Sequence, residues 1–328
     1  MNAKQTLSLF IILVCYNGTI AGAAQSEAQS YPTKPIRMIC PSAPGGTTDL
    51  SARLVAQNLT EAWGKQVVVD NRPGSGGGLG TELVARAAPD GYTLLLGTIT
   101  SHAINPALNK HLNFDPIKDF SAVSLVVSSP QLLAVNPALP VRSVKDLIAL
   151  AKAKPGQVNY GSAGTGNSSH LVVELFKIAT GTNLVHVPYK GSGPAITGVV
   201  SNEVQMIITG VVALSPHLKS GRLRGVAVTS AKRVPAFPEL PTFMESGIEK
   251  FDVSSWFGVF VPAHTPKSII GKLNYQIRKM LEDREIQKRL TDSGAEPSSS
   301  TPEQFTAFVR SELARWDNVV KQAHIPTH

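Results

Sequence analysis

Short apolar runs alternate along the chain with segments rich in glycine, serine and threonine, and most of those segments lead into an amphipathic helical pattern. The first unit consists of the apolar run 36–40, a polar loop over 41–49, and apolar residues at three- and four-residue spacings up to Trp63. Such spacings indicate a helix with one buried face. A strand, a loop and a helix in this order are typical of α/β folds with parallel-rich sheets.

The same order recurs to the end of the chain. The strands that the pattern predicts are 67–70, 93–96, 123–127, 131–135, 158–160, 184–187, 204–209, 225–228 and 253–261. The predicted helices include 144–153, 170–179, 213–220, 268–282 and 302–323. Because Ser128-Ser129-Pro130 interrupts the apolar pattern and the pattern restarts near residue 131, we expect two domains. The first comprises residues 31–128 plus 253–328, and the second comprises residues 129–252.

Residues 1–23 carry the features of an export signal. Lys4 precedes a short apolar run that ends at Val14, and Ala21-Gly22-Ala23 fits a signal-peptidase cleavage site. We therefore expect a cleaved leader and a periplasmic protein. Two alternatives remain open: an uncleaved anchor, and a lipoprotein acylated at Cys15. No second apolar stretch is long enough to cross a membrane.

Charge and cysteine content narrow the class of protein further. The net charge is +8, but the basic residues are dispersed and only 6% of residues are aromatic. Nucleic-acid binding favours a concentrated basic stripe with stacking aromatics, so we expect no nucleic-acid partner. Without the leader only Cys40 remains, which excludes an internal disulfide and indicates a small buried core residue.

Three polar loops each follow a predicted strand and open a helix: residues 44–49, 97–101 and 164–170. The first turn of a helix presents unpaired backbone N–H groups and a partial positive charge, and glycine lets a ligand approach the backbone. Ligands of open α/β sheets bind at the carboxyl ends of the strands. We therefore predict an anion-binding cleft shared by the two domains. The segment Tyr189-Lys190-Gly191 contributes to the same cleft. The candidate ligand-binding residues are Ala43, Gly45, Gly46, Thr47, Thr48, Asp49, Thr98, Ser101, Gly164, Thr165, Gly166, Ser168, His170, Tyr189 and Thr209.

Motifs for catalysis, metals and nucleotides are absent from the sequence. There is no P-loop, no G-x-G-x-x-G, no G-x-S-x-G nucleophile elbow and no H-E-x-x-H. We expect no enzymatic activity, no metal and no cofactor. Asp49 is a candidate catalytic carboxylate but fits an N-cap role better. For His170, ligand contact and a capping or packing role both stay open.

Several of these segments resemble the substrate-binding receptors of tripartite tricarboxylate transporters, the Bug family. The matching runs occur in order over nearly the whole mature chain, at residues 31–37, 44–49, 70–74, 88–94, 159–164, 186–191 and 255–258.

The resemblance implies a periplasmic-binding-protein fold of the Venus flytrap type (type II-like), with two α/β domains joined by crossing strands near 128–131 and 252–256. It also implies a monomer that delivers a small organic carboxylate to a membrane permease, with the carboxylate held by loops 43–49 and 164–170. Many members carry an aspartate where this chain has Thr209, which we expect to weaken any preference for a ligand with an ammonium group. A sensor that presents ligand to a signalling receptor and a secreted α/β hydrolase remain the alternative functions.

Overall fold

The computed structural model describes residues 30–109, 111–249 and 251–322. The strands are β1 (Ile36–Cys40), β2 (Val67–Asn71), β3 (Thr93–Thr98), β4 (Phe120–Val135), β5 (Asn159–Ser162), β6 (Val185–Pro188), β7 (Met206–Gly210), β8 (Arg224–Val228), β9 (Ser254–Pro262) and β10 (Glu296–Pro297). The α-helices are α2 (Thr47–Trp63), α3 (Gly78–Ala85), α4 (Asn105–Leu108), α5 (Val144–Ala153), α6 (Ser168–Thr180), α7 (Ser192–Val200), α8 (Val211–Lys219), α9 (Lys267–Glu282), α10 (Arg284–Asp292) and α11 (Pro302–Gln322). A 3₁₀ turn, η1 (Ser75–Gly77), and a π turn, η2 (Thr100–Ile104), complete the described elements.

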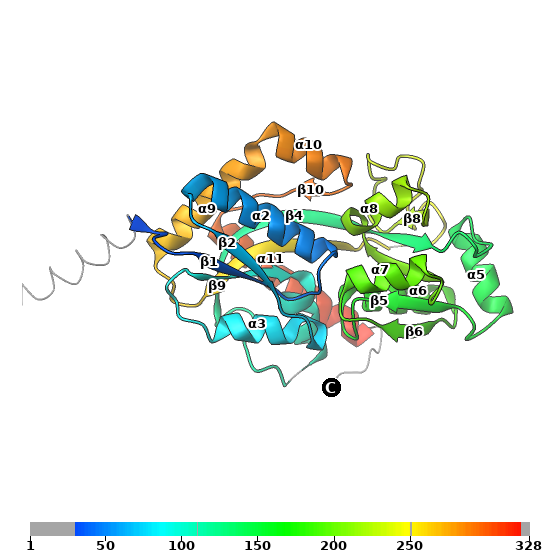
Figure 1. Ribbon diagram of the computed structural model, residues 1–328. Helices are drawn as coiled ribbons and strands as arrows, with labels where there is room; N and C mark the ends of the chain where they lie inside the picture. The colour runs from blue at the N-terminus through cyan, green and yellow to red at the C-terminus, as the bar shows by residue number, and fades with distance from the viewer. Residues whose placement is uncertain (1–29, 110, 250, 323–328) are drawn as a thin grey trace, which may run out of the picture.

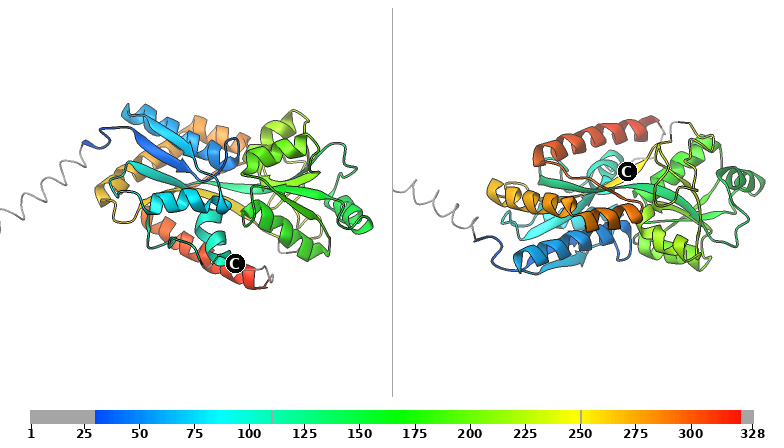
Figure 2. Two further views of the ribbon diagram at one scale, coloured as in Figure 1. Left: turned by 60° about the horizontal axis from the view of Figure 1, so that its bottom comes forward. Right: turned by 90° about the horizontal axis from the view of Figure 1, so that it is seen from above.

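The strands form one path, β2-β1-β3-β9-β4-β7-β5-β6, with β8 and β10 also paired to β4. β1 is parallel to β2 and β3, and β5 is parallel to β6 and β7, whereas β4 and β9 run antiparallel to their partners. The chain is therefore a mixed α/β fold with two strand groups that share β4. The groups lie side by side, one mainly blue, cyan and orange and the other green (Figure 1, Figure 2).

Helices cover both faces of each strand group, because central strands such as β1, β3, β4, β7 and β9 carry apolar side chains toward both layers. In the first group, α2, α9 and α10 pack on one face and α3 and α11 on the other. In the second group, α7 and α8 cover one face and α5 and α6 the other. The chain leads into helices at the carboxyl ends of the strands β1, β3, β5 and β7.

β4 is a single strand of 16 residues, so the break predicted at Ser128-Ser129-Pro130 is wrong. Pro130 pairs with Ser254 of β9, and the next residue, Gln131, pairs with Gly210 of β7. A proline lacks the N–H that a ladder needs, and here it lies where the strand changes partner. The pattern signalled a change of partner rather than an end of the strand.

Local capping signals gave correct boundaries where they are strong. Ser143 opens α5 through a complete capping box with Asp146, and Gly64 ends α2 in the left-handed conformation with φ 62°. The helix α10 was not predicted, although Asp283 caps it by accepting two backbone N–H groups. Cys40 is fully buried, as expected.

The predicted leader 1–23, with Cys15, lies outside the described residues. Within the described ranges, no helix combines the length and the apolar character needed to cross a bilayer. The division into domains 31–128 plus 253–328 and 129–252 stays a prediction.

His102 in η2 makes the stability of this fold sensitive to acid. Its ring is buried and stacks on Phe260 with centroids 4.0 Å apart, and burial lowers its pKa from 6.5 to about 3. The pKa of His102 is lower in the folded protein than in the unfolded chain. Its contribution to the free energy of unfolding is therefore complete above pH 6.5 and is lost as the pH falls toward 3. Between neutral pH and about 4.5, this group alone should cost on the order of 2 to 3 kcal/mol.

We expect His102→Phe, which keeps the stacked ring but removes the titrating group, to reduce the loss of unfolding free energy over that pH range. Urea unfolding at both ends of the range measures it, with His111→Phe as the control at an exposed histidine. The same loss in both variants would show that His102 does not carry the acid sensitivity.

Candidate functional site

The segment 41–49 comprises the loop after β1 and the first turn of α2. It is shaped by the carboxylate of Asp49, which is only 2% exposed. Its Oδ2 accepts from the backbone N–H of Gly45 and from Nε of Arg53, both at 3.0 Å, and its Oδ1 accepts from Nδ2 of Asn71 at 2.9 Å. The N-cap of α2 is Gly46, so the N-cap role predicted for Asp49 is wrong. Asp49 instead lies in the first turn and reaches back to Gly45, where it satisfies the same kind of unpaired N–H.

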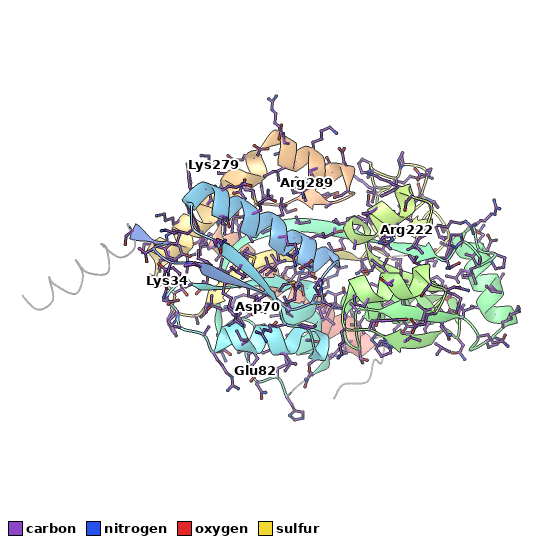
Figure 3. The ribbon with its side chains drawn as sticks, in the orientation of Figure 1. Lys34, Asp70, Glu82, Arg222, Lys279 and Arg289 are labelled. Atoms are coloured by element: carbon purple, nitrogen blue, oxygen red, sulfur yellow. The ribbon has the colours of Figure 1, made fainter. Side chains whose placement is uncertain are left out.

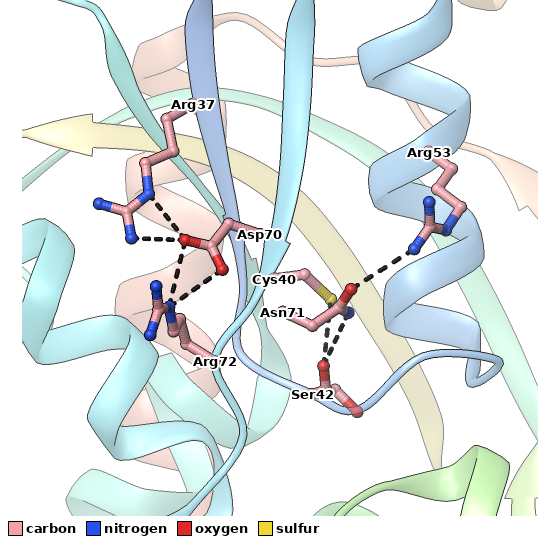
Figure 4. Close-up of polar contacts among 7 residues, drawn as sticks. All are labelled: Arg37, Cys40, Ser42, Arg53, Asp70, Asn71 and Arg72. Carbon is pink, nitrogen blue, oxygen red and sulfur yellow. Dashed lines mark hydrogen bonds and ion pairs between the residues drawn. The ribbon is translucent and has the colours of Figure 1, made fainter.

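Asn71 joins this loop to the glycine-rich loop that follows β2. Its Nδ2 also donates to the carbonyl of Ser42 at 2.9 Å, and its Oδ1 accepts from Nη2 of Arg53 at 3.4 Å (Figure 4). Two residues of the same edge, Arg37 and Arg72, bind the carboxylate of Asp70. Loops 41–49 and 71–77 are therefore held together as one unit.

The titratable groups of this unit are not set up for catalysis. Burial raises the pKa of Asp49, but hydrogen bonds from Arg53, Gly45 and Asn71 outweigh it and hold the pKa below its usual value. Asp49 is thus ionised, with both oxygens bonded. Burial raises the pKa of the Cys40 thiol to about 12, which leaves it a poor nucleophile.

The loop from β5 to α6, residues 163–170, is supported by its own side chains. The N-cap residue Asn167 accepts from the N–H of Ser169 at 3.1 Å, and the hydroxyl of Ser169 accepts from the N–H of Ala163 at 2.8 Å. Gly164 and Gly166 have φ values of 126° and 75°, a region in which other residues are strained. The loop therefore needs its glycines for its path.

His170 lies under this loop and supports it. Its Nδ1 accepts from the N–H of Gly166 at 3.2 Å, and its ring stacks on His186 with centroids 4.0 Å apart. Burial lowers the pKa of both rings, to about 4 for His186. Two roles were left open for His170, ligand contact and a capping or packing role, and the geometry favours packing.

The loop after β3 uses its hydroxyl groups internally. Ser101 is fully buried, and its Oγ accepts from the N–H of Thr98 at 2.9 Å and contacts Nδ1 of His102 at 2.9 Å. The neighbouring Thr100, which was not predicted, accepts from the N–H of Ser168 at 3.2 Å. This bond links the loop after β3 to the start of α6, in the other strand group.

Loops of the two strand groups touch at further points. The N–H of Ala43 donates to the carbonyl of Lys190 at 3.3 Å. A methyl group at Gly193 would lie 2.2 Å from the carbonyl oxygen of Pro44, and one at Gly210 would lie 2.4 Å from Oγ1 of Thr47. These two glycines allow close contact between the strand groups at Pro44 and Thr47.

A cavity of about 240 Å³ lies where these loops meet. It is lined from the first strand group by Pro41, Ser42 and residues 73–77, and from the second by Ala163, Gly164, Thr165, Asn167, Tyr189 and Lys190. Lys190 is the one charged residue in this lining, so the cavity favours an anion and offers hydroxyl, amide and backbone donors to hold it.

The predicted residues fall into three sets. Gly164, Thr165 and Tyr189 line the cavity. Ala43, Gly45, Gly46, Thr47, Thr48, Thr98, Gly166, Ser168 and Thr209 belong to the loops and strand ends around the junction, and Oγ1 of Thr47 is buried with no hydrogen-bond partner among the described residues. Asp49, Ser101 and His170 have side chains engaged in supporting their own loops.

Thr100, Asn167 and Lys190 lie in segments that the sequence singled out but were not named as individual ligand-binding candidates, and the lining residue Ser42 was missed. The glycine-rich loop 71–78 was a visible signal for the missed lining at 73–77, since it also follows a strand and opens a helix. Across residues 30–322, apart from 110 and 250, no group of three or more His, Cys, Asp or Glu residues is arranged to hold a metal ion.

Comparison with known proteins finds relatives of similar sequence and fold. Residues 51–325 match the family model described as "Tripartite tricarboxylate transporter family receptor". Protein BugT of Bordetella pertussis is 38% identical over 323 residues, which cover 98% of each chain. The structure of R. palustris Rpa4515 with adipate superposes with a TM-score of 0.88 at 38% identity, covering 91% of this chain and 100% of that one. The periplasmic binding protein BugD gives a TM-score of 0.88 at 35% identity, covering 91% and 100%. The chain thus has the fold of a periplasmic binding protein.

Asp49→Ala should destabilise the protein by about 2 kcal/mol, because it leaves the Gly45 N–H, the Asn71 amide and the Arg53 guanidinium without their shared acceptor. Urea unfolding at neutral pH measures the change. The matched control is Asp317→Ala on α11, whose side chain is 50% exposed and makes one surface ion pair with Lys321, so that its cost should stay below about 1 kcal/mol. Equal costs for the two variants would contradict a special role for Asp49.

Proposed function

The chain belongs to the family of tripartite tricarboxylate transporter receptors, and from that membership we propose that it captures a small organic dicarboxylate and delivers it to a membrane permease. The observation that carries the proposal is the meeting of loops 41–49 and 163–170 around a cavity whose one charged lining residue is Lys190. The adipate in the Rpa4515 structure supports a dicarboxylate as the class of ligand.

Recognition of the carboxylates relies on neutral donors with fixed geometry. The first turn of α2 points unpaired N–H groups at the junction, and the first turns of both α2 and α6 contribute a partial positive charge there. The buried hydroxyl of Thr47 has no hydrogen-bond partner among the described residues, and Thr165 lines the cavity, so these two hydroxyls add further donors. A buried carboxylate is tolerated only when its oxygens are well bonded, and these donors meet that requirement.

Binding is coupled to closure of a clamp. The two lobes are residues 31–128 plus 253–328 and residues 129–252, and they move about β4 and β9 near 128–131 and 252–256. The change of partner between Pro130 and Gln131 in β4 supports this boundary. A ligand that touches both lobes favours the closed form by its higher affinity for that form.

Thr209 sets the preference between acids and amino acids. It lies at the end of β7, is 4% exposed, and donates to the hydroxyl of Ser192 at 3.2 Å. Because the side chain is neutral, it offers no counter-ion for a ligand ammonium group. The site therefore favours simple dicarboxylates over aspartate and glutamate.

The protein works as a monomeric binding protein in the periplasm after removal of residues 1–23, and it carries out no reaction on its ligand. The relatives that are periplasmic binding proteins support this location. The buried, bonded state of Asp49 and the high pKa of Cys40 support the absence of a nucleophile or general base in the junction.

Thermal unfolding in the presence of C4 to C6 dicarboxylates, monocarboxylates, aspartate and glutamate tests this function. A dicarboxylate at 100 times its Kd should add about 2.7 kcal/mol of stability, seen as a rise in Tm of a few degrees. Aspartate and glutamate should raise Tm less at equal concentration.

Thr209→Asp is the specificity variant. The added carboxylate should repel a dicarboxylate and favour the amino acids, so that the order of the Tm shifts reverses. If no acid raises the Tm of protein that was unfolded and refolded to remove any co-purified ligand, the proposed function is wrong.

A further inference from the structure

A second cavity, of about 410 Å³, lies between α2, α8 and α10, with Val127 of β4 in its lining. It shares no lining residue with the cavity between the loops. Its lining residues are Leu50, Ser51, Arg53, Leu54, Gln57, Val127, Val212, Ser215, Pro216, Arg289, Leu290 and Ser293. A cavity of this size falls within the range of small-molecule pockets.

The lining is amphipathic. Leu54 on α2, Val212 on α8 and Leu290 on α10 give it an apolar interior, and Leu50 is a large apolar side chain that is 39% exposed. Two guanidinium groups, from Arg53 and Arg289, are present, and no Asp or Glu is among the lining residues. Arg53 is paired with Asp49, which leaves Arg289 without a counter-ion, and an apolar surface beside such a cation suits a ligand with an apolar chain and an anionic head.

Arg289 is the cation that is available to such a ligand. It makes no hydrogen bond or ion pair with another described residue, and its position on α10 is marked in Figure 3. The carboxylates nearest along the same helix are Glu285, one turn earlier, and Asp292, which is bound by Lys288 at 2.5 Å. Arg53 uses Nε for Asp49, and a guanidinium with five N–H donors retains others.

We propose that this cavity is a second binding site, for a small amphipathic monoanion such as a medium-chain carboxylate. The chain lies against the leucine and valine side chains, and the carboxylate binds Arg289 with help from Arg53. Because α2 and α10 belong to one strand group and α8 to the other, the bound molecule bridges both groups. This site is separate from the cleft that takes the dicarboxylate, and its occupancy does not require that cleft to be filled.

Isothermal titration of the full-length protein with octanoate tests the site, with octanol and octylammonium as probes that lack the anion. We expect saturable binding of one octanoate per chain and no comparable binding of the other two probes. Binding should persist in saturating adipate. Loss of all octanoate binding in adipate would place octanoate in the first cleft and overturn the proposal, as would the absence of saturable binding.

Two variants locate the bound octanoate. Arg289→Gln should weaken binding about tenfold, the typical loss of one charge-assisted contact. Leu50→Glu, at an exposed position, should weaken it by repelling the carboxylate. The matched control is Lys279→Gln on α9, which removes the same charge away from the cavity (Figure 3). Equal affinity for octanoate in the Arg289 and Lys279 variants would overturn the site.

Adipate titrations keep this result distinct from the proposed function. Octanoate binding that depends on Arg289, in a protein that fails to bind any dicarboxylate, would support the second site and contradict the first. Dicarboxylate binding without octanoate binding would do the reverse.

Discussion

The continuity of β4 through Pro130 is the constraint on which the rest of the structure depends. On one side of this point β4 pairs with β9, and on the other with β7 and β8. There the N–H of Thr229 donates to the carbonyl of Gln131 at 2.8 Å. The hydroxyl of Thr229 accepts from the N–H of Gln131 at 3.0 Å and donates to the carbonyl of Val253 at 2.5 Å. Because the two strand groups share this strand, the loops after β1 and β5 line one cavity, and Gly193 of α7 and Gly210 of β7 let the second group approach the segment 41–49 closely.

Different groups at the junction hold the loop in shape and contact the ligand. The one buried carboxylate of loop 41–49, on Asp49, is neutralised by Arg53 and by N–H donors and serves to hold the loop in shape. The cavity lining itself contains only neutral groups and Lys190. A negatively charged ligand therefore meets donors already fixed in place, so little of its binding energy is spent on ordering the protein.

The sequence pattern predicts much of the fold, since periodicity and caps are local. The Ser143 capping box, the left-handed Gly64 and the strand-to-helix loops could all be read from neighbouring residues. What could not be read depends on contacts across the chain. Pro130 looks like a strand end unless β7 is known to take over the pairing, and Asp49 looks like an N-cap unless Asn71 and Arg53 are known to reach it.

The same limit applies to the site. Thr100 accepts a hydrogen bond from Ser168, 68 residues away, and no local pattern marks that partner. His170 and Ser101 are polar residues in polar loops, but their side chains turn back to support the backbone. Polar composition thus located the loops correctly, whereas the direction of each side chain required the tertiary structure.

Small-angle X-ray scattering with and without adipate tests most directly whether close contact between the two strand groups is how the ligand is held. The account predicts that adipate lowers the radius of gyration of the wild-type protein. It should not do so in Gly193→Ala, whose added methyl group collides with Pro44, while Gly271→Ala, which has open space around it, contracts as the wild type does. An unchanged radius of gyration in the wild type at saturating adipate, or equal contraction in the two glycine variants, would contradict this account.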